Sequence, residues 1–323
     1  MKKMLKIALI AAAAAAAFGA SAQEFPAKDK TVTIVVPFAA GGPTDRVARD
    51  LAEALRKPLG ATVVVDNTAG AGSSIGAARV ARATPDGYTL LLNHIGMSTM
   101  PALYRKLSFN VANDFEYLGI INDVPMTLIG RPTLPANNYQ ELLAWMGQNK
   151  GAINLGNAGL GSASHLCGLM FQSAIKTDMT AVSYKGAAPA ITDLLGGQVD
   201  AAFQNINNVL PHINGGKLRV LAVAAPKRSP LLPNVPTLAE SGVKDAEATS
   251  WQGVVAPKGL PPEVKAKIHA ALTEALADPV VKQKFAEVGF ELVANTPEQF
   301  TAYQASEAAR WKKLIGTRKI AAD

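Results

Sequence analysis

Residues 35–46 read VVPFAAGGPTDR and connect two elements of regular structure. The β-branched, apolar run at residues 31–36 predicts a strand before this segment. After it, apolar side chains recur at helical spacing from Val47 to Leu55 and predict a helix. Pro37 and the pair Gly41-Gly42 interrupt both patterns. The segment is therefore predicted to be a strand, a tight turn and a helix N-terminus, and it favours an α/β fold.

A turn of this kind is suited to binding an anion. Gly41 and Gly42 allow positive φ angles and the close approach of a ligand, and Thr44 or Asp45 can cap the helix. The N–H groups of the first helical turn and the positive end of the helix dipole favour a carboxylate or phosphate. One such turn is also an ordinary connection. However, residues 156–165, GNAGLGSASH, repeat the arrangement between a predicted strand and helix.

The first 22 residues have the pattern of a secretory signal peptide. A basic start, MKKMLK, precedes an Ala-rich apolar run, and the small residues Ala20-Ser21-Ala22 precede the polar Gln23. Cleavage there leaves 301 residues and lowers the net charge from +7 to about +4. No later stretch is long and apolar enough to be a transmembrane helix. We expect a soluble, exported protein.

Composition argues against several classes of function. The single cysteine, Cys167, cannot form an intramolecular disulfide and lies in an apolar segment, so we expect a small buried residue. Lys and Arg form no cluster and aromatic residues make up 6% of the chain, which argues against nucleic-acid binding. The four histidines, at positions 94, 165, 212 and 269, lack the spacing of metal ligands. We expect neither a metal nor another cofactor.

Predicted strands and helices alternate along most of the chain, which is typical of α/β layers with a parallel or mixed sheet. The predicted strands are 31–36, 62–66, 88–92, 115–123, 126–130, 153–155, 179–184, 199–203, 218–224 and 250–256. The later predicted helices are 73–83, 139–148, one that follows the turn at 156–165 and runs on to residue 175, 189–195, 207–214, 262–276, 279–288 and 297–315. The last carries a stripe of large apolar residues that we interpret as a packing face.

The chain is predicted to cross between two domains near residues 123–125 and 246–250. Domain 1 would then comprise residues 23–123 and 249–323, and domain 2 residues 124–248, with a cleft between them. Ligands of open α/β sheets bind outside the carboxyl ends of the strands, where both glycine-rich turns would lie. This organisation predicts a bilobed binding protein.

Four segments carry a specific resemblance: VVPFAAGGPTDRVAR (35–49), VVVDNTAGAGSSIGAARVARATPDGYTLLL (63–92), YKGAAPAITDLLGGQVDAAF (184–203) and LPHINGGKLRVLAV (210–223). With RSPLLPNVPTLAESG (228–242), they resemble the periplasmic solute receptors of tripartite tricarboxylate transporters, the Bug-type family. The resemblance covers essentially the whole chain after the predicted signal peptide.

The resemblance implies a periplasmic Venus-flytrap protein without enzymatic activity. Such a protein captures a small carboxylate, or an aromatic acid or amide, and delivers it to a membrane permease in transient contact. We expect a monomer. In place of the Asp that family members often carry after the Phe of strand 199–203, this chain has Gln204-Asn205, a difference that bears on the ligand's charge and size.

The resemblance also implies that the loops at residues 38–45 and 157–165 build the site. In the second loop, Ser162, Ser164, His165 and Leu166 match the family's hydroxyl residue and His-Leu pair. Neighbouring strand ends, together with Met97, would supply the far wall. The candidate ligand-binding residues are Phe38, Ala39, Gly41, Gly42, Thr44, Asp45, Asn93, His94, Asn157, Gly159, Ser162, Ser164, His165, Tyr184, Lys185, Gly186, Gln204 and Asn205.

Residues 70–76, GAGSSIG, match two enzyme motifs. Gly72-Ser73-Ser74-Ile75-Gly76 fits GxSxG, so the alternative function is a secreted serine esterase with Ser74 as nucleophile and His269 as the candidate base. A nucleophile elbow places its serine at the strand end, however, whereas Ser74 lies well past Asp66. The same residues form a loose dinucleotide fingerprint, but they follow the second predicted strand, not the first. We interpret them as a structural glycine turn.

Overall fold

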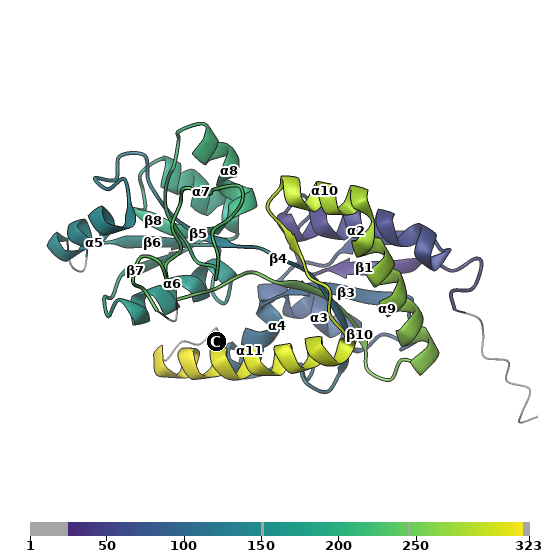
Figure 1. Cartoon of the computed structure of the whole chain (residues 1–323). Helices are drawn as coiled ribbons and strands as arrows, with labels where there is room; N and C mark the ends of the chain where they lie inside the picture. The colour runs from purple at the N-terminus through teal and green to yellow at the C-terminus, as the bar shows by residue number, and fades with distance from the viewer. Residues whose placement is uncertain (1–24, 150–151, 245, 319–323) are drawn as a thin grey trace, which may run out of the picture.

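The computed structural model describes residues 25–149, 152–244 and 246–318, so the predicted signal peptide lies outside the described residues. Two β-sheets with helices around them form two lobes (Figure 1). The first sheet has the order β11-β4-β10-β3-β1-β2 and the second β7-β6-β8-β5-β9. The first sheet contains β1 (Val32–Val36), β2 (Val63–Asn67), β3 (Thr89–His94), β4 (Phe115–Asp123), β10 (Gln252–Pro257) and β11 (Glu291–Leu292). The second contains β5 (Met126–Gly130), β6 (Asn154–Asn157), β7 (Thr180–Ser183), β8 (Ala201–Asn205) and β9 (Arg219–Val223).

The two sheets share one topology. In the first, β1 lies parallel between β2 and β3, and β10 runs antiparallel between β3 and β4. In the second, β6 lies parallel between β7 and β8, and β5 runs antiparallel between β8 and β9. The predicted α/β architecture with mixed sheets is confirmed. Each sheet draws its strands from one of the two predicted residue sets, and the division into two domains stays a prediction.

Helices cover both faces of the first sheet because its strands are apolar on both sides. Along β1, Ile34 and Val36 belong to one core cluster, with α2 (Pro43–Leu59) and α9 (Pro262–Ala277), whereas Val35 belongs to another. That second cluster includes residues of α3 (Ser74–Ala81), α4 (Gly96–Leu103) and α11 (Pro297–Arg318). The remaining helices are α10 (Pro279–Glu287) beside the first sheet and α5 (Tyr139–Gln148), α6 (Ala163–Ala174), α7 (Ala187–Leu195) and α8 (Ile206–Asn214) around the second. None of the described helices is long and apolar enough to span a membrane.

The C-terminal helix α11 runs beneath both lobes (Figure 1). Phe300 and Trp311 are fully buried on its predicted apolar stripe, which confirms the packing face. Farther along the helix, Arg310 Nη2 donates to the carbonyl of Glu247, at 2.7 Å, and contacts Met170 of α6. The helix therefore joins the first sheet's core to the second lobe.

Most predicted elements are present with boundaries shifted by at most three residues, but helix α4, strand β11 and the short 3-10 helix η1 (Ala71–Ser73) were not predicted. Helix α4 follows β3 directly although Pro101 lies inside it. Strand β11 has only two residues and forms one edge of the first sheet by pairing with β4. The prediction for Cys167 is confirmed, because its side chain is fully buried and burial raises its thiol pKa far above the usual value.

Candidate ligand-binding site

The strand order creates the same special position in both sheets. From β1 the chain moves to β2 on one side and then to β3 on the other, and from β6 it moves to β7 and then β8 in the same way. Ligands of open α/β sheets bind at such a topological switch point, outside the carboxyl ends of the strands. The two predicted glycine-rich turns follow β1 and β6 and therefore lie at these two positions.

The carboxyl edges of both sheets adjoin the same connecting segments. Strand β4 ends at Asp123 and β5 begins at Met126, where it pairs with Asn205 at the carboxyl end of β8. Pro125 forms a bridge with Thr249 on the returning segment, and Thr249 Oγ1 donates to Asp123 at 2.7 Å. The two switch points therefore lie on either side of one pair of crossing segments.

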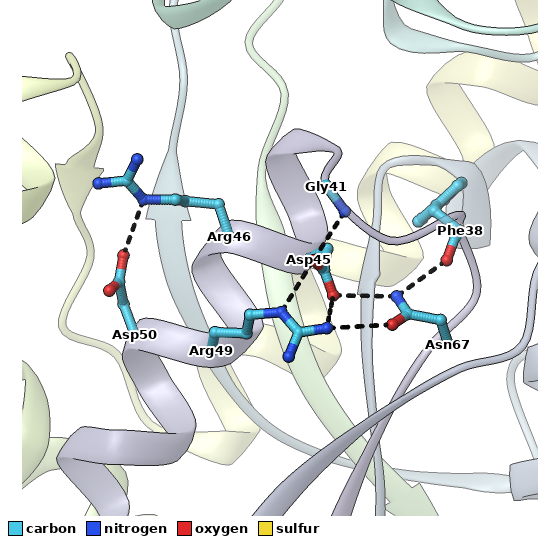
Figure 2. Close-up of polar contacts among 7 residues, drawn as sticks. All are labelled: Phe38, Gly41, Asp45, Arg46, Arg49, Asp50 and Asn67. Atoms are coloured by element: carbon cyan, nitrogen blue, oxygen red, sulfur yellow. Dashed lines mark hydrogen bonds and ion pairs between the residues drawn. The ribbon is translucent and has the colours of Figure 1, made fainter.

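A polar network holds the first turn in place (Figure 2). Asp45 accepts from the Gly41 N–H at 2.8 Å, from Arg49 Nε at 2.9 Å and Nη2 at 3.0 Å, and from Asn67 Nδ2 at 3.0 Å. Asn67 Nδ2 also donates to the carbonyl of Phe38 at 3.1 Å. The Asp45 side chain thus fixes the turn at both ends and has little capacity left for a ligand.

The predicted capping of α2 by Thr44 or Asp45 is wrong. Gly42 is the N-cap, no side chain caps the helix, and Pro43 occupies the first turn. Thr44 Oγ1 instead accepts from Gln252 Nε2 of β10 at 3.1 Å. Because proline has no N–H, the first-turn donors without an intrahelical acceptor are the N–H groups of Thr44 and Asp45.

Charge on Asp45 is favoured by its partners. Burial of the carboxyl opposes ionisation, but the bonds from Arg49, the Gly41 N–H and Asn67 outweigh it and lower the pKa of Asp45 below its usual value. Arg49 is paired with the carboxylate, so the turn itself carries little net charge. Its attraction for an anion must come from backbone N–H groups and the helix dipole.

His94 joins this turn to the end of β3. Its ring stacks on Phe38 with centroids 4.5 Å apart, and its Nδ1 accepts from the Gly96 N–H at 2.7 Å. Burial lowers the pKa of His94 to about 4, so the ring is neutral at pH 7 and carries its proton on Nε2. The preceding residue, Asn93, is fully buried; its Oδ1 accepts from the His94 N–H.

The loop before α3 also lies at the carboxyl edge of the first sheet, beside the first turn and the end of β3. A Cβ on Gly76 would lie 2.7 Å from Pro37 Cβ, so the start of α3 packs against the first turn. Ser73, the N-cap of α3, is 1% exposed, and its hydroxyl has no partner among the described residues. It lies 3.5 Å from where a Cβ on Gly96 would stand. The N-termini of α2, α3 and α4 therefore gather around Phe38 and His94.

The second turn is held together by its own serines. Ser162 caps α6 by accepting from the His165 N–H at 3.3 Å, and Ser164 Oγ accepts from the Ala158 N–H at 2.8 Å. The two hydroxyl oxygens are 3.1 Å apart. If one hydroxyl proton bridges this pair, the other remains for a ligand. Asn157 Oδ1 accepts from the Gly159 N–H at 2.9 Å and closes the turn.

His165 resembles His94 in its bonding. Its Nδ1 accepts from the Gly161 N–H at 3.3 Å, and burial lowers its pKa. Both switch points therefore hold a neutral histidine whose free donor is Nε2–H. Gly161 also meets the first lobe, since a Cβ on it would lie 2.5 Å from Leu103 Cδ1 of α4.

The remaining candidate ligand-binding residues lie around the carboxyl ends of the strands of the second sheet. Tyr184 donates its N–H to the carbonyl of Asn157, but its hydroxyl donates to Asp193 at 2.8 Å, so that oxygen is already engaged. Lys185 is exposed, and Gly186, at φ 122°, is the N-cap of α7. Gln204 is buried at the end of β8, and Asn205 is the N-cap of α8. The predicted strand stopped at residue 203, whereas β8 includes both residues.

Sequence reasoning missed the residues that position the first turn. Arg49 lies four residues after Asp45 on a helix, which is the usual spacing of an ion pair and could have been noticed. Asn67 ends β2, beside β1, but its contact with Phe38 depends on strand register. Ser73 and Gln252 could not be assigned to the site from the sequence, because only the structure shows the buried hydroxyl of Ser73 and the hydrogen bond from Gln252 to Thr44. Met97, predicted on the far wall, is fully buried in the core instead.

Two cavities of about 250 and 430 Å³ lie elsewhere in the first lobe. The smaller lies between β4, α9 and residues 292–295, and the larger between α4 and α11. Neither is lined by any of the predicted ligand-binding residues. Within the described ranges, no three His, Cys, Asp or Glu side chains are grouped as metal ligands would be.

The structure separates the residues of the esterase alternative. Ser74 begins α3, which packs on the face of the first sheet that includes Val35. His269 lies in α9 on the opposite face, with its Nδ1 3.0 Å from the Leu118 carbonyl. A serine nucleophile needs its base within hydrogen-bonding distance, and the sheet stands between these two.

Comparison with known proteins decides the family. Residues 47–320 match the tripartite tricarboxylate transporter family receptor, TctC. This chain belongs to that receptor family. It is similar to the periplasmic binding protein BugD, at 44% identity over 90% of this chain and 98% of that one, with a TM-score of 0.82. The bilobed α/β fold and the solute-receptor function predicted from the sequence are confirmed, and the esterase alternative is not supported.

Two further receptor-like structures contain a ligand. MatC from Rhodopseudomonas palustris, solved with bound malate, is 34% identical over 90% of this chain and all of that one, with a TM-score of 0.81. Rpa4515 of R. palustris, solved with adipate, is 34% identical over 92% of this chain and 99% of that one, with a TM-score of 0.85. Both of these ligands are small dicarboxylates.

Proposed function

We propose that this receptor binds a small dicarboxylate, with one carboxylate on the turn after β1 and the other on the turn after β6. The observation that carries the proposal is the duplicated switch point. Six helices begin there, three at each sheet: α2, α3 and α4 after β1, β2 and β3, and α6, α7 and α8 after β6, β7 and β8. Each N-terminus presents N–H donors and a positive dipole end.

Backbone donors suit a ligand that must be released as well as bound. A hydrogen bond to a charged group contributes roughly 1.5–3 kcal/mol, and a partly buried helix N-terminus up to about 2 kcal/mol. A few such contacts are enough for micromolar binding, which corresponds to about 8 kcal/mol, after the cost of immobilising the ligand. The ligands of the two R. palustris relatives, malate and adipate, support two carboxylates.

An aromatic acid or amide is the second candidate, and the pair Phe38–His94 is the observation that favours it. The two rings are stacked and only partly buried beside the first turn. A flat ligand could extend this stack while its carboxylate binds the same N–H groups. The His94 Nε2–H would supply a neutral donor to either class of ligand.

Transport by this receptor requires two domains that close around the ligand. The crossing segments at residues 123–126 and 249–252 would act as the hinge, and a ligand that contacts both lobes would favour the closed state. We infer a monomer without enzymatic activity, exported to the periplasm by its signal peptide, that hands its ligand to a membrane permease. Small-angle scattering should show a smaller radius of gyration when a verified ligand is present.

A thermal-shift screen tests the ligand class directly. Malate, succinate and adipate should raise the melting temperature, because a ligand that binds only the folded state stabilises it. Succinamide, the uncharged analogue of succinate, should produce no shift at the same concentration. If the aromatic acids alone stabilise the protein, the second candidate replaces the first.

Replacement of both Ser162 and Ser164 by Ala tests the second turn. Loss of their remaining donor should weaken dicarboxylate binding by roughly 1.5–3 kcal/mol, or more than tenfold. Ser306→Ala is the matched control, since the Ser306 hydroxyl lies on the exposed side of α11 and, among the described residues, bonds the Tyr303 carbonyl alone. Equal affinity of the double variant and the control would exclude the turn from the site.

A further inference from the structure

The returning segment, residues 247–251, is held by hydrogen bonds to both of its neighbours. The Ala248 N–H donates to the carbonyl of Ala224 in the second lobe at 2.9 Å, and the Ser250 N–H donates to the carbonyl of Val124 on the other crossing segment, also at 2.9 Å. The chain therefore leaves the second lobe and enters the first sheet within a short stretch, and any rotation of one lobe against the other has to bend this stretch.

Helix α11 contacts the returning segment at both of its ends. At the first lobe, Trp251 is 1% exposed, and its ring packs on Phe300 and Tyr303 with centroids 5.5 and 6.0 Å apart. At the second lobe, Arg310 Nη2 donates to the carbonyl of Glu247 at 2.7 Å. Tyr303 and Arg310 are about two turns apart, roughly 10 Å along the helix axis. The helix thus spans the returning segment from one lobe to the other (Figure 1).

The Arg310 side chain is oriented by its own helix. Glu307 is 7% exposed, and its carboxylate accepts from Arg310 Nη1 at 3.2 Å and from Trp311 Nε1 at 2.8 Å. Arg310 Nη2 also lies 3.5 Å from the sulfur of Met170 in α6. Trp311 and Ile315 are buried in the core cluster that includes Met170. One oriented guanidinium and an apolar contact therefore attach the end of α11 to the second lobe.

The residues around β11 contact the second lobe on the opposite face of the first sheet. Lys227 Nζ lies 3.0 Å from Glu291 Oε2, and a Cβ on Gly289 would lie 2.8 Å from Ile206 Cγ2. Phe290 shares a core cluster with Ile206, whereas α11 belongs to the cluster on the other face. The C-terminal part of the chain therefore borders the crossing segments on both faces, and separation of the lobes has to act against these contacts.

We propose that α11 is a brace of the hinge, in which Arg310 and the buried side chains near it hold the second lobe against the helix and limit how far the lobes separate without ligand. This inference rests on the closing motion proposed above. The bonds of Arg310 include none of the candidate ligand-binding residues, so it is a positioning residue. Because apparent affinity depends on the fraction of receptor in the binding-competent arrangement, such a brace tunes affinity from outside the site.

Single-molecule energy transfer between two dyes measures the separation of the lobes in the folded protein. The dyes are attached through Ala144→Cys in α5 and Ala270→Cys in α9, because both alanines are exposed. Cys167 can stay in place, since its side chain is fully buried. Without ligand, Arg310→Ala should increase the population with low transfer efficiency at least about threefold, because a hydrogen bond between a charged group and the second lobe is lost. Lys313→Ala, which removes another exposed cation of the same helix, is the matched control and should match wild type.

Urea unfolding of the same variants separates a brace from a residue that only stabilises its helix. A lower midpoint for Arg310→Ala with the efficiency distribution of the Lys313→Ala control would overturn the inference, as would equality of the two variants in both measurements. If Arg310→Ala does not fold, Arg310→Gln, whose amide is too short to bond Glu307 and the second lobe together, decides in the same way.

Addition of malate or adipate separates this inference from the proposed function. Once thermal shift has verified that one of them binds, its excess should move wild type and Arg310→Ala to the same population of high transfer efficiency. If a verified ligand leaves the wild-type distribution unchanged, the lobes do not close and the proposed motion fails. The comparison of Arg310→Ala with Lys313→Ala needs no ligand and still decides whether α11 restrains the lobes.

Discussion

Replacement of Asp45 by Asn should destabilise the protein by about 2–4 kcal/mol. The carboxylate is 3% exposed and accepts from the Gly41 N–H, Asn67 Nδ2 and Arg49. The first two are hydrogen bonds to a charged acceptor, worth roughly 1.5–3 kcal/mol each, and an amide oxygen can replace only one of them well. The Arg49 side chain is more than half exposed, so its ion pair adds at most about 1 kcal/mol.

Asp50→Asn is the matched control on the same helix (Figure 2). Its carboxylate is paired with the exposed side chain of Arg46, at 3.4 Å, and with Lys284 at 3.9 Å. Surface pairs of this kind contribute about 0–1 kcal/mol. Urea unfolding of the wild type and both variants measures the difference. Equal losses in the two variants would refute the assignment of Asp45 as the residue that holds the turn.

The same variants make a prediction about pH and about binding. Because its partners lower the pKa of Asp45 below 3.8, the stability that it contributes is present above that pH and is lost as the pH falls through the folded-state pKa. The difference in the free energy of unfolding between wild type and Asp45→Asn should therefore shrink below about pH 4. Ligand affinity at pH 7 should also fall by about tenfold or more, since the Gly41–Thr44 donors lose their fixed position.

Other residues give independent tests. Burial lowers the pKa of His94 to about 4, so the unfolded chain binds the extra proton first and stability should fall as the pH drops from about 6.5 towards 4; an NMR titration of the ring that shows an ordinary pKa would contradict this. Gly161→Ala should cost about 1–3 kcal/mol, because φ is +74° and the new Cβ would overlap the side chain of Leu103, and Leu103→Ala should relieve part of the loss in a double-variant unfolding cycle. Trp311→Phe should lower the free energy of unfolding by about 1–3 kcal/mol, because the carboxylate of Glu307, a residue that is 7% exposed, loses the hydrogen bond from the indole N–H at 2.8 Å. If the variant unfolds at the same denaturant concentration as the wild type, this hydrogen bond does not contribute to stability.

The sequence predicts the first turn well because each part of it follows from local chemistry. The β-branched run before Val36 favours a strand, and Gly41 adopts a φ of +82° that few other residues tolerate. The cap could not be predicted from residue preference alone. Asp45 is a good capping residue in isolation, but Asn67 and Arg49 draw its carboxylate towards the centre of the turn.

Tertiary contacts explain the elements that were missed. Pro101 argues against a helix at residues 96–103, yet α4 forms because Met97, Met100 and Leu103 are buried in the core cluster that α4 shares with α11. Strand β11 has two residues and exists only through its pairing with β4. No local pattern predicts either element.

The repeat of strand, glycine-rich turn and helix was predicted from the sequence, but the strand order that makes each turn a switch point was not visible. Strand order depends on which strands pair, and the order β2-β1-β3 recurs as β7-β6-β8 without a matching sequence repeat. The pairing also explains why Gln204 and Asn205, predicted to follow a strand, lie inside β8. Met126 pairs with Asn205 and extends the ladder to that residue.

A crystal structure with the dicarboxylate that gives the largest thermal shift tests the central claim most directly. We expect one carboxylate within hydrogen-bonding distance of backbone N–H groups in residues 39–45 and the other within reach of the N–H or hydroxyl groups of residues 158–164. The lobes should be closer together than in the ligand-free protein. A ligand bound in one lobe only, or with both carboxylates away from these turns, would contradict the account.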